Sequence, residues 1–312
     1  MSSINTTATA PFELWFIFVD ISAIIALVFA VLLAVCFLTV VVLNKTCQTI
    51  PTLLTCASFI AEIVLGCNMM SIAIFSLEND RKRRIFQDPL CVFRDYLGYV
   101  GTGMLLYSLT LQALYRYIIV VYPRRLFWQS ISVQGVLVCF CWIFCITSLL
   151  PWFLAGYSTY DVNNQLCMLP FRRAIPVIYN VSIVYLIPLC FIILIYVKLV
   201  RYVHRMDSHN GSSTQTVFQA RRELTVVKRI VTIISVLVIF GLPFTFFMFL
   251  SFVTTPPKYH YRFSLLSSEL LQTVIVIGLF RCSQPVVDVL LKFKRRFSNI
   301  NQLSNKNSSA EK

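Results

Sequence analysis

Arg116 interrupts an apolar run, in the stretch "LYRYIIVVYPRR" that covers residues 114–125. Tyr115 and Tyr117 flank it, and Pro123 and a basic pair follow. An uncompensated charge in hydrocarbon is costly, so an arginine in such a setting indicates a functional site that binds a counter-ion or a partner. Its role depends on where the segment lies.

The other residues that could do chemistry do not assemble into a catalytic or metal-binding set. The three histidines, His204, His209 and His260, do not cluster as metal ligands, so we expect no metal and no cofactor. The stretch "GYVGTG" at 98–103 has no preceding strand, and we interpret it as small residues that allow close helix packing. No nucleophile, base and acid set appears, so we expect no enzyme.

The composition places the chain in a lipid bilayer, since 58% of its 312 residues are apolar and only 13% are charged. Seven segments have the roughly 20 mostly apolar residues that a spanning helix needs. They lie at about 12–43, 51–77, 92–121, 131–155, 174–200, 227–253 and 264–291. The fold class predicted is an all-α membrane protein, a seven-transmembrane-helix bundle forming one domain over 1–300, with a disordered tail at 301–312.

The lysines and arginines set the expected orientation. The N-terminal tail, residues 1–11, has none. Of the 27, 17 fall on the side of the C-terminus and 9 on the other side, and Arg281 lies deep in the seventh segment. Positive charge is enriched in cytoplasmic loops, so we predict a multi-pass plasma-membrane protein with an extracellular N-terminus and a cytoplasmic C-terminus. The net charge of +14 therefore reflects membrane topology, and no nucleic-acid partner is expected.

Two of the eleven cysteines fall on the predicted outer, oxidising side. Cys91 starts the third segment and Cys167 lies in the loop after the fourth, and we predict a disulfide between them; the alternative is two free thiols. The 25 residues from Cys91 to Arg116 make roughly 37 Å of helix, which puts Arg116 at the inner boundary. Asn5 begins an Asn-Thr-Thr sequon and is the predicted glycosylation site.

Taken in order, the motifs resemble those of rhodopsin-family (class A) G-protein-coupled receptors over essentially the whole chain. The matching residues are Tyr115-Arg116-Tyr117 with Pro123, Trp142 of helix four, Pro188 and Tyr196 of helix five, Pro243 of helix six, and Gln284-Pro285-Val286-Val287-Asp288 of helix seven. The resemblance implies a receptor that senses an extracellular ligand. It would activate a heterotrimeric G protein by outward movement of helix six and release of Arg116.

Several positions depart from the family pattern. The acid before the helix-three arginine is Tyr115, the helix-two aspartate is Glu62, and the helix-seven tyrosine is Asp288. The helix-six tryptophan is missing from the stretch 240–243. These changes indicate a divergent member with an altered activation switch.

The family also implies a partner for Arg116. A glutamate 20 residues before the helix-six proline contacts this arginine in the resting state, and Glu223 stands 20 residues before Pro243. We therefore predict an Arg116–Glu223 pair at rest; the alternative is that Arg116 only extends to the cytoplasmic interface. Asp288 either binds Arg116 after activation or caps the next turn.

A second pair is predicted inside the membrane. Glu62 is the only charge deep in the second segment, and Arg281, four residues before Pro285, is the only base deep in the seventh. Family geometry places these positions side by side, around the site where a sodium ion normally binds. We predict a buried Glu62–Arg281 salt bridge and little effect of sodium. The alternative is that each charge finds its own polar partners or water.

The outer half of the bundle is the expected ligand pocket. Residues at a suitable depth are Tyr99, Thr102, Tyr179, Asn180, Phe244, Phe247 and Gln272. Gly98 stands where amine receptors carry an aspartate and Gly278 where opsins carry the retinal lysine, so we expect neither an amine nor retinal but another small molecule or a peptide. The stretch "ENDRKRR" at 78–84 could attract an anionic ligand, although a solvated loop is the favoured interpretation.

The inner face has two features that resemble family elements. The loop 201–228 resembles the G-protein surface, and the amphipathic "LKFKRRF" at 291–297 resembles a short eighth helix, about 291–300, that binds membrane lipid. Two alternatives to a coupling receptor stay open. One is a seven-helix transporter or channel whose ion path Glu62 and Arg281 line, and the other is a receptor-like protein that does not couple.

Overall fold

The computed structural model describes residues 14–82, 89–162, 164–171, 173–208, 214–254, 257, 259–283 and 285–292, with only part of the side chains between 206 and 240. The described chain is a bundle of long helices with one short hairpin. The helices are α1 (Leu14–Leu43), α2 (Ile50–Lys82), α3 (Cys91–Val121), α4 (Ile131–Leu154), α5 (Ala174–Val181), the π-helix η3 (Ser182–Leu186), α6 (Ile187–Ser208), α7 (Thr214–Val253) and α8 (His260–Cys282). Two 3-10 turns, η1 (Lys45–Cys47) and η2 (Leu126–Gln129), lie between helices.

Six of these helical stretches within the described ranges are long and apolar enough to cross a membrane, counting α5, η3 and α6 as one. They are Trp15–Leu43, Ile50–Lys82, Cys91–Val121, Ile131–Leu154, Ala174–Arg205 and His260–Cys282. Helix α7 contributes a shorter apolar stretch, Gly241–Val253. Each of the seven predicted segments therefore overlaps a helix, and α7 begins 13 residues before its predicted start at 227.

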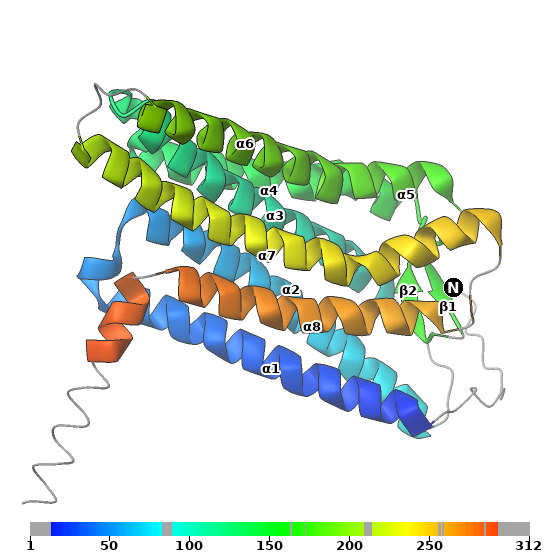
Figure 1. Cartoon of the computed structure of the whole chain (residues 1–312). Coiled ribbons are helices and arrows are strands. Elements are labelled where there is room, and N and C mark those ends of the chain that lie inside the picture. The colour runs from blue at the N-terminus through cyan, green and yellow to red at the C-terminus, as the bar shows by residue number, and fades with distance from the viewer. Residues whose placement is uncertain are drawn as a thin grey trace, which may run out of the picture.

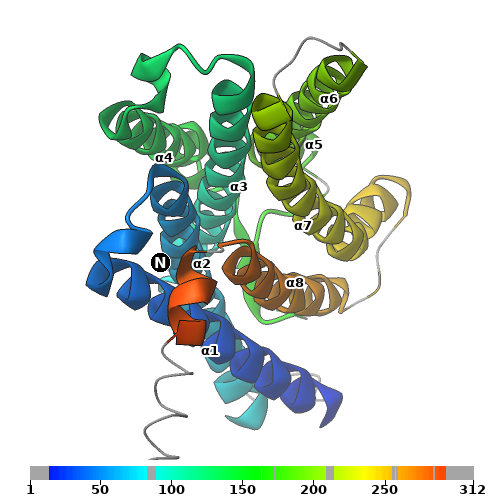
Figure 2. The ribbon, with the colours of Figure 1, turned by 60° about the vertical axis from the view of Figure 1, so that its left-hand side comes forward.

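The helices run roughly side by side along one axis (Figure 1). The hairpin lies at one end of the bundle, near the start of α1 and the start of α8, and we call this the disulfide end because Cys91 and Cys167 join there. Seen from another side, α3 passes between α2 and α4 on one flank and α6 and α7 on the other (Figure 2). Helix α3 is therefore the central element of the bundle.

Glycines let α3 approach its neighbours closely. A Cβ at Gly101 would stand 3.2 Å from Leu65 of α2, and one at Gly103 would stand 3.1 Å from the sulfur of Cys145 of α4. Gly98 faces Met69 in the same way. The interpretation of "GYVGTG" as a helix-packing stretch is confirmed.

The π-helix η3 has a local cause. Pro188 has no N–H, so it cannot continue the hydrogen-bond ladder, and the N–H of Ile187 bonds the carbonyl of Ser182 in the wider π pattern. The carbonyl of Ile183 thereby loses its helical donor. The hydroxyl of Tyr107 on α3 donates to it at 3.0 Å, which fastens the distorted turn to the central helix.

The predicted continuous helix 264–291 is wrong at its end. Helix α8 stops at Cys282, and Ser283 leaves the helical conformation with φ −87° and ψ 79°. Pro285 explains why the helix does not continue, since its nitrogen has no hydrogen to donate to the carbonyl four residues earlier and its ring would clash with that carbonyl. Helical residues 285–292 follow, and the predicted eighth helix lies outside the described residues beyond 292.

A hairpin that sequence reasoning left as a loop joins α4 to α5. Strand β1 (Thr159–Asp161) pairs antiparallel with β2 (Leu166–Met168), and Tyr160 stands opposite Cys167. Gly156, with φ +66°, ends α4 in the left-handed conformation that favours glycine and turns the chain toward β1. All three residues of β2 are buried, so the strand is an inward part of the bundle.

Candidate functional site

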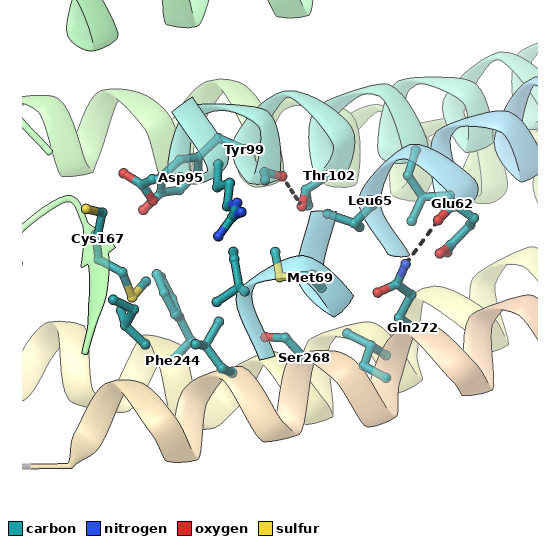
Figure 3. A pocket seen from close by; sticks show the side chains of 18 of the residues that line it. Glu62, Leu65, Met69, Asp95, Tyr99, Thr102, Cys167, Phe244, Ser268 and Gln272 are labelled. Carbon is teal, nitrogen blue, oxygen red and sulfur yellow. Dashed lines mark hydrogen bonds between the residues drawn. The ribbon is translucent and has the colours of Figure 1, made fainter. Parts of the chain in front are cut away.

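A cavity of about 120 Å³ lies between α2, α3 and α8, toward the disulfide end (Figure 3). Strand β2 and single residues of α7 and η3 complete its wall. The lining residues are Glu62, Leu65, Met69, Ile72, Arg94, Asp95, Gly98, Tyr99, Thr102, Leu105, Leu166, Cys167, Met168, Tyr185, Phe244, Leu265, Ser268, Leu271, Gln272 and Ile275. Most of them are apolar or aromatic, with a few polar groups, which is the usual character of a ligand site.

Helix periodicity explains which side chains face the cavity. On α3, Asp95, Tyr99 and Thr102 follow at spacings of four and three residues and so share one face. The residues of α2 and α8 that line the cavity likewise lie on one face of each helix, and they include Glu62 and Gln272. Figure 3 shows Asp95 and Cys167 at one end of the cavity and Glu62 and Gln272 at the other.

The disulfide holds β2 against this cavity. Cys91 and Cys167 are bonded, with their Cα atoms 5.4 Å apart, so the predicted disulfide is confirmed. The hydroxyl of Ser158, just before β1, donates to the carboxylate of Asp95 and fastens the hairpin to α3 a second time. The predicted glycosylation site Asn5 lies outside the described residues.

Four of the seven expected ligand residues, Tyr99, Thr102, Phe244 and Gln272, line the cavity. The other three do not. The hydroxyl of Tyr179 donates to the carbonyl of Ser148 at 3.2 Å. Asn180 is buried, and Phe247 packs beside His260 with ring centroids 5.9 Å apart.

Sequence reasoning missed several lining residues, of which Asp95 is the most consequential. It lies one helical turn before Tyr99 and so shares its helix face, a spacing that could have identified it. The contribution of β2 had no comparable signal in the sequence. It depends on the hairpin and on the disulfide that fixes it.

The predicted Glu62–Arg281 salt bridge is wrong. Glu62 is 2% exposed, and neither oxygen of its carboxylate has a hydrogen-bond partner among the described residues. Arg281 is exposed near the end of α8. The residue of α8 at the level of Glu62 is Gln272, whose side-chain amide donates to the Glu62 carbonyl at 3.1 Å. Arg281 comes nine residues later, about 13 Å farther along the helix axis, which is out of reach.

Among the described residues, a buried ion pair forms at the disulfide end instead. Arg262 of α8 donates to both carboxylate oxygens of Asp80 of α2, at 2.6 and 3.1 Å. Asp20 of α1 approaches the same guanidinium at 3.7 Å, and the ring of Phe16 lies 4.1 Å from it. Arg262 and Asp80 are 4% and 1% exposed. This cluster joins three helices around one buried cation.

The favoured interpretation of "ENDRKRR" as a solvated loop is wrong about the conformation of residues 78–82, which are helical, and about Asn79 and Asp80, which are buried. Helix α2 continues to Lys82, and Glu78 and Lys82 form an exposed ion pair one turn apart on its surface. Asp80 points inward instead, because it lies on the opposite side of the same turn. The remainder, residues 83 and 84, lies outside the described residues.

Comparison with known families agrees with this architecture. The sequence model of the family described as 7 transmembrane receptor (rhodopsin family) matches residues 25–284, well over half of the chain. The chain belongs to the rhodopsin family. No curated protein sequence matches it significantly. Members of this family are multi-pass membrane receptors that bind extracellular ligands and G proteins, and they are generally not enzymes.

At the end of this rhodopsin-family receptor opposite the disulfide, α3 carries three of the predicted switch residues. Tyr115, in the place of the family acid, is 6% exposed and packs with Leu54 and Leu111, so it acts as a core residue. Arg116 is half-buried, and the ring of Tyr117 meets that of Tyr122 edge-on at 6.2 Å.

The remaining switch residues lie on three helical segments. Tyr196 is half-buried on α6, Pro243 lies inside α7, and Pro285 and Asp288 are exposed in the helical segment 285–292. The side chain of Glu223 is outside the described set. The Arg116–Glu223 pair and the role of Asp288 therefore stay predictions.

Proposed function

We propose that the chain is a seven-span plasma-membrane receptor that binds an extracellular ligand in the cavity between α2, α3 and α8 and activates a heterotrimeric G protein at its opposite end. The observation that carries this proposal is that one helix, α3, lines the cavity with Asp95, Tyr99 and Thr102 and carries Arg116 near its other end. In this assignment α7 supplies the remaining span. The disulfide end and the N-terminus are extracellular.

A ligand in the cavity can change the bend of α7 through its contact with one residue of that helix. Phe244 lines the cavity and directly follows Pro243, which lies inside α7. A proline inside a helix removes one backbone hydrogen bond and allows the helix to bend there. A ligand that displaces Phe244 thus acts at the position where α7 bends most easily. In the proposed mechanism α7 then moves outward and releases Arg116 from Glu223.

The distance between the two sites suits a rigid connector. From Tyr99 to Arg116 is 17 residues, or about 25 Å along α3. When α7 bends, the part of α7 beside Arg116 moves relative to α3. The conformation of α3 itself does not have to change. The proposal therefore assigns α3 to the stationary part and α7 to the moving part.

Nucleotide exchange by a panel of heterotrimeric G proteins tests this function. The wild type, Glu223→Ala and Arg116→Ala are co-expressed with each G protein at matched surface levels. We expect Glu223→Ala to raise basal exchange, because it removes the resting partner, and Arg116→Ala to lower it. Lys45→Ala is the control, since Lys45 is an exposed cation of η1 at the same end of the bundle.

If no variant changes exchange by any G protein, coupling is refuted and the likeness to the family ends at the fold. Transport measurements on the same variants would then examine the channel or transporter alternative.

A further inference from the structure

We infer that the ligand of this cavity is a small organic cation whose ammonium group binds the carboxylate of Glu62. The inference rests on the proposed receptor function and adds to it the chemical class of the ligand. It starts from a carboxylate that the protein buries and leaves without a counter-charge.

Glu62 lines the deep end of the cavity (Figure 3). It is 2% exposed, and both of its carboxylate oxygens are without a hydrogen-bond partner among the described residues. The amide of Gln272 donates to the Glu62 backbone carbonyl at 3.1 Å. A buried charge without a counter-charge is strongly unfavourable. The ammonium group of a ligand in the cavity would supply that counter-charge.

The rest of the cavity wall suits the body of an organic cation. Leu65, Leu105 and Ile275 supply apolar surface, and Tyr99, Tyr185 and Phe244 supply aromatic rings. Figure 3 shows Tyr99 and Phe244 nearer to the Asp95 end, so these two rings would contact the body of the ligand and not its ammonium group. A metal ion would need several oxygen, nitrogen or sulfur ligands around it, and no group of three histidine, cysteine, aspartate or glutamate side chains that could hold one is found in the described part of the chain.

A second carboxylate also favours a positively charged ligand. Asp95 lies at the outer end of the cavity, 8% exposed, and accepts a hydrogen bond from Ser158. The one base in the lining, Arg94, is also near this end, where its guanidinium lies 5.6 Å from the ring of Phe75. The deep half of the cavity therefore has one charged group, the carboxylate of Glu62. A ligand with a single ammonium at one end and an apolar body matches that arrangement.

The expectation that amines are excluded rested on Gly98 alone. Gly98 does line the cavity and has no side chain, so α3 offers no carboxylate at that level. Glu62 supplies one from α2 instead, deeper in the bundle. The inference therefore concerns amines whose ammonium group binds α2 instead of α3, at a deeper level in the bundle.

Binding to the purified full chain in lipid nanodiscs tests the inference. Thermal unfolding is followed by tryptophan fluorescence during titration with isopentylammonium and 2-phenylethylammonium, each beside its neutral alcohol, isopentanol and 2-phenylethanol. Phosphate buffer is used, because amine buffers are organic cations. A separate arm replaces potassium chloride with sodium chloride. The variants are Glu62→Gln and, as a matched control, Glu269→Gln, a buried α8 acid that does not line the cavity.

We expect at least one ammonium ion to raise the melting temperature of the wild type more than its alcohol does. Glu62→Gln should weaken the apparent affinity by about tenfold or more, because it removes a charge-assisted hydrogen bond. Glu269→Gln should leave the affinity unchanged. If Glu62→Gln does not fold, Ser268→Phe, which narrows the cavity and keeps Glu62, should abolish the protection.

Three results would overturn the inference. One is equal protection by ammonium and alcohol, or none by either; another is equal loss in the two glutamine variants; the third is protection by sodium without protection by ammonium, which would assign Glu62 to an inorganic ion. None of these depends on a G protein. If nucleotide exchange responds as proposed and ammonium ions do not raise the melting temperature, the receptor function is supported and the proposed ligand class is refuted. The reverse pattern leaves the cation site in place and refutes coupling.

Discussion

The buried cluster around Arg262 gives the sharpest prediction on stability. Replacing Arg262 with glutamine removes the cation that faces Asp80 and Asp20, and it leaves two buried carboxylates beside each other. Breaking a buried pair from one side costs about 3–5 kcal/mol. Two hydrogen bonds to Asp80, at 2.6 and 3.1 Å, and the contact with Phe16 at 4.1 Å are lost together. We place Arg262→Gln at the upper end of that range.

The two acids of the cluster should respond differently. Asp80→Asn removes the acceptor of both hydrogen bonds and should cost about 3 kcal/mol. Asp20 is 3.7 Å from the guanidinium, and its Oδ2 has no hydrogen-bond partner among the described residues. For Asp20→Asn we expect a change of less than about 1 kcal/mol, because the lost attraction to Arg262 is offset by relief of burial and of repulsion from Asp80.

The measurement is the apparent melting temperature of the purified variants, followed by tryptophan fluorescence, together with surface expression. The expected order of damage is Arg262→Gln, then Asp80→Asn, then Asp20→Asn, with the first lowering the melting temperature by roughly 10 °C. The double variant Arg262→Gln with Asp80→Asn should lose less than the sum of its singles, since the two residues interact directly. Equal damage from Asp20→Asn and Asp80→Asn, or a harmless Arg262→Gln, would refute the reasoning.

Three further predictions concern the central helix and the hairpin. Tyr107→Phe should destabilise the protein by about 1–3 kcal/mol in thermal unfolding, because it leaves the carbonyl of Ile183 without a donor; an unchanged melting temperature would contradict that account of the π-helix. Replacing Cys91 and Cys167 together by alanine opens a loop with a sequence separation of 76 and should cost about 2–4 kcal/mol. It should also weaken ammonium binding, and intact binding would show that β2 is held without the disulfide. Burial of the side chain raises the pKa of Tyr160 to about 12 from its ordinary value of 10.0. Its contribution to stability is therefore full below pH 10 and is lost as the pH rises toward 12, so Tyr160→Phe should reduce the alkaline loss of stability measured over that range.

The sequence alone determined the elements and the approximate depth of several residues in the bundle. Apolar runs of sufficient length placed the spans, because hydrocarbon admits helices whose backbone is satisfied internally. The positions of Cys91 and Cys167 on the expected outer side predicted the disulfide, and the expected depth of Tyr99 and Thr102 predicted them as cavity residues. These conclusions depend on how far along its segment a residue lies, which follows from the rise of a helix per residue.

Only the tertiary structure decided which charges meet. Arg262 and Asp80 are 182 residues apart, and Arg281 was assigned to Glu62 by family position, although Gln272 stands at that level. Each residue turns a helix by roughly 100° and advances it by about 1.5 Å, so small shifts in rotation and axial offset between two helices exchange one partner for another. Those offsets are set by packing, such as the close contact of Gly66 with Gln272, where an added Cβ would stand 3.1 Å from the amide. The pairing of buried charges is thus a property of the packed bundle and of no single segment.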